Sequence, residues 1–285
     1  MIRVAVATSA GDDVDDDAPI LLDALRDVEI EGVPRVWDDA AVDWNDYDLV
    51  VIRSTWDYTD RRERYLAWAE GIDRLWNPYP IIAYSTDKHY LADLARRGHR
   101  VVATTFCDVG AIPTFPDGDF VVKPAVGAGS MHADKYRADE TERATAHVTR
   151  LHARDRDAVI QPYEAAIDEL GEHALVFIDG TFSHAMTKGP MLNVAEPDRN
   201  ALFRQEQMSV AIAEPDALEV AHAVLGEDEF QGILYARVDM VLTDVGWAVM
   251  ELELVEPSLF LSYDEAAPRR LARAIRSRVA ANTKV

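Results

Sequence analysis

Cysteine is almost absent from this 285-residue chain, which carries only Cys107. A single cysteine cannot form a disulfide within the chain, and the residues around it lack the spacing of a metal site. We therefore interpret Cys107 as a small packed side chain. Neither a disulfide framework nor a cysteine metal centre is expected.

Positive charge is also scarce, because 29 lysines and arginines face 51 aspartates and glutamates, for a net charge of -22. Nucleic acids and anionic membranes bind cationic surfaces, so neither is expected as a partner. No apolar run approaches the roughly 18 residues of a membrane span, and the N-terminus enters a strand without a signal segment. A cytoplasmic protein is expected.

Lysine is rare even among the basic residues, with five lysines in the chain. Lysine is a flexible point charge suited to phosphate, whereas arginine suffices for surface ion pairs. Lys88, Lys123 and Lys188 fall in segments with the features of a binding site, and the other two are Lys135 and Lys284. The first three are therefore candidate ligand contacts.

Residues 247–258 place two glutamates inside an apolar run that alternates like a β-strand. Glu251 and Glu253 point to one face, while Leu252 and Leu254 point to the other. Neighbouring carboxylates repel unless a cation lies between them, and Mg²⁺ binds such oxygen ligands together with substrate phosphates. A half-exposed edge strand with an acidic outer face explains this stretch alone equally well.

The preceding strand alternates in the same way and is joined to the first by a turn at residues 243–246. In the resulting hairpin, Arg237 and Asp239 share a face with Glu251 and Glu253. One arginine and three carboxylates on one face favour a seat for a metal-bound triphosphate.

The N-terminal segment predicts an open α/β unit, with strands at residues 2–7, 33–36 and 49–52 and a helix near residues 21–28. Ligands of such sheets bind beyond the carboxyl ends of the strands. One of these ends, residues 8–13, lacks the glycine spacing of a nucleotide-binding turn and is interpreted as an acidic loop.

The other strand end reads Arg53-Ser54-Thr55-Trp56-Asp57-Tyr58. This combination suits a small zwitterion, with Arg53 on its carboxylate, Asp57 on its amine and the aromatic rings excluding water. A structural ion pair between Arg53 and Asp57 is the alternative. The sequence alone does not separate the two.

A helix is predicted from Ser85 to a terminal glycine at Gly98. Its first turn contains Lys88, although helix starts favour acidic residues. Lys88 therefore either pairs with Asp87 beside it or reaches an anion bound at the helix start.

The segment from residue 120 delivers Lys123 from a short strand into the small-residue loop Gly127-Ala128-Gly129-Ser130. Backbone N–H groups of such a loop can surround phosphate oxygens. After a helix at residues 140–151, a strand ends in Gln161-Pro162-Tyr163, and its proline predicts a free edge that can border an adenine ring. Asp179-Gly180 then predicts a hairpin that ends at Lys188.

These motifs resemble the ATP-grasp carboxylate ligases over residues from about 84 to the end. The resemblance rests on Asp87-Lys88, on Lys123-Pro124 before the glycine-rich loop, on Gln161-Pro162-Tyr163, and on the pairs Arg237/Asp239 and Glu251/Glu253. It implies an α/β ATP-grasp fold with three parts. These are an N-terminal open α/β domain at residues 1–83, a linker helix and central lid at 84–165, and a C-terminal antiparallel-sheet domain at 166–285.

The resemblance also implies the roles of individual residues. ATP would contact Lys88, Lys123, Gly127, Ala128, Gly129, Ser130, Gln161, Pro162 and Tyr163, with Asp168 or Glu169 on the ribose. Two Mg²⁺ ions, or Mn²⁺ in their place, would be held by Asp239, Glu251 and Glu253. The catalytic cations would be Arg237 and Lys188, and the substrate would contact Arg53, Ser54, Thr55, Trp56, Asp57, Tyr58, Glu256 and Ser258.

Within this family, residues 53–58, 87–91 and 254–261 are most similar to the cyclo-ligases of antibiotic biosynthesis that convert O-ureido-D-serine to D-cycloserine. The expected activity is the ATP-dependent activation of a small amino-acid-like carboxylate as an acyl phosphate, followed by intramolecular capture by nitrogen. The alternatives are a ligase that joins two molecules and an ATP-binding module without catalysis. A homodimer is left open.

Overall fold

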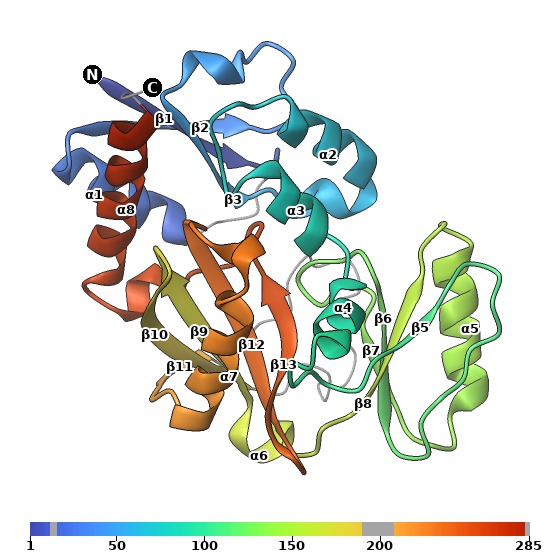
Figure 1. Ribbon diagram of the computed structural model, residues 1–285. Coiled ribbons are helices and arrows are strands. Elements are labelled where there is room, and N and C mark those ends of the chain that lie inside the picture. Colours follow the sequence, from blue (N-terminus) through green and yellow to red (C-terminus); the bar gives the residue numbers. More distant parts are fainter. Residues whose placement is uncertain (12–15, 190–207, 283–285) are drawn as a thin grey trace.

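The computed structural model describes residues 1–11, 16–189 and 208–282 and contains three sheets (Figure 1). The first sheet is parallel, with the order β2-β1-β3-β4. Its strands are β1 (Ile2–Thr8), β2 (Ile30–Val36), β3 (Leu49–Ser54) and β4 (Leu75–Trp76). The helices of this region are α1 (Asp17–Asp27), α2 (Arg62–Glu70) and α3 (Tyr79–Ser85), with short 3₁₀ turns η1 (Trp44–Asp46) and η2 (Trp56–Asp60). The predicted open α/β unit is present.

The second sheet is antiparallel, has the order β5-β8-β6-β7 and packs on a single helix (Figure 1). Its strands are β5 (Thr105–Cys107), β6 (Phe120–Pro124), β7 (Asp134–Tyr136) and β8 (Ala158–Pro162), and the helix is α5 (Thr141–His152). The apolar positions of α5 fall on one face, and Ala144, Val148 and Leu151 are buried against the sheet.

The third sheet is antiparallel, with the order β11-β10-β9-β12-β13. Its strands are β9 (Glu172–Ile178), β10 (Thr181–Lys188), β11 (Met208–Ala211), β12 (Tyr235–Thr243) and β13 (Gly246–Glu253). The predicted hairpin joins β9 to β10, and both turn residues, Asp179 and Gly180, have positive φ, as a two-residue turn of this kind requires. The remaining elements of the region are α6 (Ile167–Leu170), α7 (Pro215–Leu225), η3 (Asp228–Phe230) and η4 (Leu261–Tyr263).

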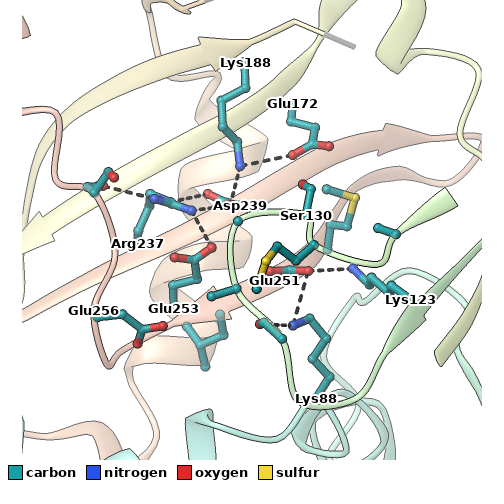
Figure 2. Close-up of a pocket in the computed structure, with 18 of the residues that line it drawn as sticks. Lys88, Lys123, Ser130, Glu172, Lys188, Arg237, Asp239, Glu251, Glu253 and Glu256 are labelled. Atoms are coloured by element: carbon teal, nitrogen blue, oxygen red, sulfur yellow. Dashed lines mark hydrogen bonds and ion pairs between the residues drawn. The ribbon is translucent and has the colours of Figure 1, made fainter. Parts of the chain in front are cut away.

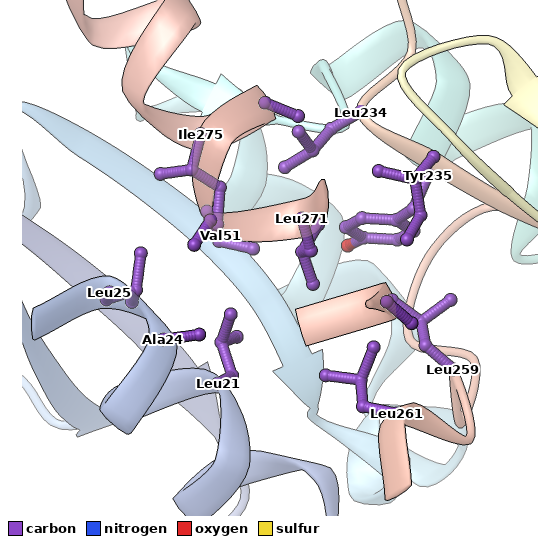
Figure 3. Packing of buried hydrophobic residues seen from close by; sticks show 14 of the residues in the cluster. Leu21, Ala24, Leu25, Val51, Leu234, Tyr235, Leu259, Leu261, Leu271 and Ile275 are labelled. Carbon is purple, nitrogen blue, oxygen red and sulfur yellow. The ribbon is translucent and has the colours of Figure 1, made fainter. Parts of the chain in front are cut away.

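The C-terminal helix α8 (Ala267–Asn282) leaves the third sheet and packs against α1 and β3 of the N-terminal region (Figure 3). Leu271 and Ile275 lie with Leu21, Leu25 and Val51 in one buried cluster that also includes strand residues of the third sheet. The last helix therefore ties the first and third sheets together. The division at residues 84 and 166 stays a prediction.

One local prediction is corrected by the structure. The helix expected from Ser85 begins only at Tyr90, as α4 (Tyr90–Arg96), because α3 occupies the chain up to Ser85. Its expected terminal glycine is present, since Gly98 has a φ of 90°. The free edge predicted at the end of β8 is present, because β5 pairs with β8 only as far as Ile160 and leaves Gln161 and Pro162 unpaired on that side among the residues described. Within the described residues, no helix has the length and apolarity to cross a membrane.

Replacing Leu271 with alanine should remove a large part of the contact between α8 and the N-terminal region, because the side chain is fully buried. Deleting a buried leucine side chain typically costs about 2–5 kcal/mol. Urea denaturation should show this loss for Leu271→Ala and almost none for Arg273→Ala, whose side chain is exposed on the same helix. Equal stability of the two variants would contradict the conclusion that α8 joins the first and third sheets.

Candidate active site

A cavity of about 460 Å³ is bounded by residues from all three regions (Figure 2). One part of its wall combines apolar side chains with the end of β8 and includes Val102, Val121, Gln161, Pro162, Tyr163, Glu164, Ile167 and Met250. The lining also includes Trp56, Tyr58, Glu256, Ser258, Ser262 and Tyr263. Charged groups and the loop at residues 127–131 complete the wall.

The hairpin of β12 and β13 brings the predicted acidic residues together. Asp239 is paired in register with Glu251, and Arg237 with Glu253. The Arg237 guanidinium donates to Asp239 at 2.9 and 3.1 Å and forms an ion pair with Glu253. The predicted shared face is therefore present, with all four side chains on the cavity wall.

Lys188 is buried and donates to Asp239 at 2.6 Å, and its ammonium lies 3.1 Å from Glu172 (Figure 2). Glu172 was not predicted as a site residue. An unbroken two-residue hairpin would place Thr187 opposite Glu172, but the register shift between Phe182 and His184 places Lys188 there. The hairpin signal alone could not find this contact, because it does not reveal the bulge.

Two further lysines reach the hairpin from outside it. Lys123, in β6, donates to Glu251 at 2.6 Å, and Lys88 lies 3.8 Å from the same carboxylate. Lys88 also donates to the carbonyl of Gly127 at 2.9 Å, which joins it to the glycine-rich loop. The four residues Gly127 to Ser130 all line the cavity, and Gly129 and Ser130 have positive φ. The rare lysines thus converge on the predicted acids.

The end of β8 forms one side of the apolar part of the cavity. Gln161 donates through its side chain to the Thr104 hydroxyl at 3.0 Å, so its amide is used to hold the strand. The Tyr163 hydroxyl donates to Asp168 at 2.6 Å. Asp168 and Glu169 are not among the lining residues, whereas Glu164, which was not predicted, is.

The substrate residues predicted after β3 divide into two groups. Trp56 and Tyr58 line the cavity, whereas Arg53, Ser54, Thr55 and Asp57 do not. Asp57 accepts from Trp37 Nε1 at 2.7 Å and pairs with Arg61, so the alternative of an Arg53–Asp57 pair is wrong. Arg53 is 1% exposed and lies 3.7 Å from Asp17.

The segment after β13 is fastened by side chains, because four consecutive carbonyls accept hydrogen bonds from distant residues. The pairs are Trp56 to Glu256 O at 3.1 Å, Arg53 to Pro257 O at 2.7 Å, Arg237 to Ser258 O at 3.1 Å and His184 to Leu259 O at 2.9 Å. Asp17 accepts from the amides of Leu259 and Leu261 at 2.8 and 2.7 Å. Buried main-chain groups without strand partners are thereby satisfied, and Glu256 and Ser258 are held at the cavity.

Electrostatics divides the acids of the site. Burial acts to raise the pKa of Glu251, but Lys123 and Lys88 outweigh it and hold the pKa well below its usual value. Burial also acts to raise the pKa of Asp239, but the charges and hydrogen bonds of Arg237 and Lys188 outweigh it and lower that pKa.

Two other glutamates shift in the opposite direction. Burial raises the pKa of Glu253 to about 7, with the charges of Asp239 and Glu251 adding to the rise against Arg237. Burial also raises the pKa of Glu256 to about 8, and the charge of Glu253 adds to it. The site therefore has more carboxylates than its own cations neutralise. Such a set of oxygen ligands fits a hard divalent cation.

The fold and this cavity define an ATP-grasp ligase. The chain superposes on a D-alanine–D-alanine ligase from Bacillus anthracis complexed with ATP, with a TM-score of 0.67 at 16% identity, covering all of this chain and 99% of the other. Much greater similarity links it to "Cycloserine biosynthesis protein DcsG" of Streptomyces lavendulae, which is 37% identical over 93% of this chain and 95% of that protein. The chain belongs to the DcsG family.

Two further comparisons agree with this assignment. Residues 4–77 match the family model of the N-terminal domain of D-cycloserine synthetase DcsG. The crystal structure of D-cycloserine synthetase DcsG superposes with a TM-score of 0.86 at 34% identity, covering 97% of this chain and 99% of the other. The predicted ATP-grasp fold and the predicted assignment to the C–N bond-forming ATP-grasp ligases are confirmed.

The raised pKa of Glu256 predicts a specific dependence of stability on pH. The unfolded glutamate ionises near pH 4.5, whereas the folded one stays protonated to about pH 8, so its contribution to stability is lost as pH rises between these values. Glu256→Gln should therefore gain melting temperature over the wild type as pH increases from 5 to 8.5, without divalent ions. A difference that stays constant across this range would contradict the shift.

Proposed function

We propose that the chain uses ATP and Mg²⁺ to convert O-ureido-D-serine to the ring of D-cycloserine. The observation that carries the proposal is the cavity of about 460 Å³, in which Lys88, Lys123 and the glycine-rich loop meet the acidic hairpin of β12 and β13. The relatives named for cycloserine synthesis supply the substrate class.

The nucleotide would lie between the second and third sheets. Lys88, Lys123 and the loop Gly127–Ser130 are placed to contact its phosphates, because both lysines and the loop line the same part of the wall. Gln161, Pro162 and Tyr163 would border the adenine together with the apolar side chains beside them. Glu164 is better placed than Asp168 or Glu169 to meet the ribose, since it alone of the three lines the cavity.

The metal ligands would be Asp239, Glu251 and Glu253, whose surplus charge favours cations. We propose two Mg²⁺ ions, and Mn²⁺ suits the same oxygen ligands. When bound, these ions neutralise charge on the phosphate oxygens. Arg237 and Lys188 contact Asp239 and are the cations that we place beside the transferred phosphoryl group.

The proposed reaction has three steps. The substrate carboxylate attacks the γ-phosphorus, ADP leaves and an acyl phosphate forms; the oxygen-bound ureido nitrogen then attacks the acyl carbon, loses its proton and displaces phosphate, which closes the ring with the carbamoyl group still on its nitrogen. Hydrolysis of that carbamoyl group, which consumes one water and releases carbon dioxide and ammonia, gives D-cycloserine. The protein's task is to position the reacting groups, to neutralise charge and to exclude water, for which Trp56 and Tyr58 are placed. No side-chain nucleophile is needed.

Ring closure is favoured over the joining of two molecules because carboxylate and nitrogen belong to one substrate. Well-oriented intramolecular reactions reach effective molarities on the order of 10⁵ to 10⁸ M, so a second amine site is unnecessary. A binding module without catalysis is disfavoured, because such a module has no need to keep the full set of Arg237, Asp239, Glu251 and Glu253.

Glu251→Gln and Glu253→Gln should each lower turnover by at least about 100-fold while the fold survives, because each removes a charged metal ligand without changing side-chain volume. Glu219→Gln is the matched control, since Glu219 is exposed on α7 outside the cavity. Turnover is measured by ADP release at saturating Mg²⁺. Near wild-type rates for both site variants would remove these residues from the metal site.

The function itself is tested by incubating the enzyme with MgATP and O-ureido-D-serine and no added amine. Ring-closed product at one ADP per product, followed by mass spectrometry and a coupled ADP assay, is the expected result. If ADP appears only when a separate amine is added, the chain joins two molecules and the cyclo-ligase proposal fails.

A further inference from the structure

The Glu256 carboxylate is buried at the cavity wall without a side-chain partner among the described residues, unlike Asp239, Glu251 and Glu253. Its residue is 9% exposed and lines the wall, yet no side-chain donor reaches it within the part of the chain that the structure describes. The cations whose charges act on it, Lys88 and Arg237, bind other groups: Lys88 contacts Gly127 and Glu251, and Arg237 contacts Asp239 and Glu253.

A buried carboxylate without a cation is costly to keep ionised. It either takes up a proton or pairs with a positive charge from a ligand. The first outcome agrees with the raised pKa of Glu256, because burial and the charge of Glu253 disfavour the ionised form. A bound cation would reverse this preference.

Hydrogen bonds to the main chain of residues 256 and 257 hold Glu256 at the cavity wall. Trp56 holds the carbonyl of Glu256 itself, Arg53 holds that of Pro257, and Pro257 has a fixed φ. Figure 2 shows the carboxylate beside Glu253 at the edge of the hairpin, away from Lys88 and Lys123. The group therefore lies at the amino-acid end of the cavity, with Trp56, Tyr58 and Ser258 on the same wall.

We propose that Glu256 binds the α-ammonium group of the substrate. This inference rests on the proposed function and assigns the amine partner that the sequence had placed at Asp57. Asp57 cannot take that role from its present position, because Trp37 and Arg61 occupy it outside the cavity. The ligand class is a small molecule that carries both a carboxylate and a primary ammonium group.

The test compares O-ureido-D-serine with 3-(ureidooxy)propanoate, which differs only by the absence of the amine. The wild type should prefer the amine-bearing compound in kcat/KM by about 100-fold or more, the range expected when one partner of a desolvated charge pair is missing. Glu256→Gln should reduce this preference to about threefold or less. Glu219→Gln, which alters an exposed glutamate of α7 outside the cavity, should keep the wild-type preference.

The possible outcomes separate this inference from the function on which it rests. If the wild type closes neither compound, the proposed function fails. If it closes both with equal kcat/KM, or if Glu256→Gln keeps the wild-type preference, only the ammonium assignment is overturned. A variant that keeps the preference but needs far more Mg²⁺ would identify Glu256 as a metal ligand instead.

Discussion

The site depends on a balance between four buried or half-buried cations and the acids that they meet. Lys88, Lys123, Lys188 and Arg237 contact Asp239, Glu251, Glu253 and Glu172, so each charge is partly compensated inside the protein. Removing one member of such a set leaves an uncompensated charge, which costs more than the contact itself contributes. Because Lys123 comes from the second sheet and the acids from the third, the charges proposed to bind the nucleotide and its metal ions also join two regions of the fold.

Local patterns predicted the parts of the site that lie within one strand pair. The alternation of Glu251 and Glu253 and of Arg237 and Asp239 was sufficient to place them on one face, and the Asp179-Gly180 turn identified its hairpin. Long-range contacts were beyond these patterns. Arg53 lies near the end of the buried strand β3, where a ligand contact was expected, but it donates a hydrogen bond to the carbonyl of Pro257, 204 residues away. No feature near Arg53 reveals that partner.

Two segments of the cavity wall, residues 256–261 and the glycine-rich loop, are held in place by different contacts. The segment at residues 256–261 is held by hydrogen bonds between its main chain and the side chains of Arg53, Asp17 and His184. The glycine-rich loop is joined to the site by Lys88. In the proposed function, the amino-acid substrate and the nucleotide would therefore contact segments with different support.

The packing of α8 on α1 and β3 has a consequence for synthesis on the ribosome. The first sheet ends at Trp76, whereas α8, the helix that covers Leu21 and Leu25 of α1, begins at Ala267, about 190 residues later. At about 5 to 20 residues per second, the N-terminal strands emerge roughly 10 to 40 seconds before their cover exists. During that interval Leu21, Leu25 and Val51 lack the α8 side chains that cover them in the folded protein. The nascent chain therefore exposes an apolar surface that a chaperone can bind until translation ends.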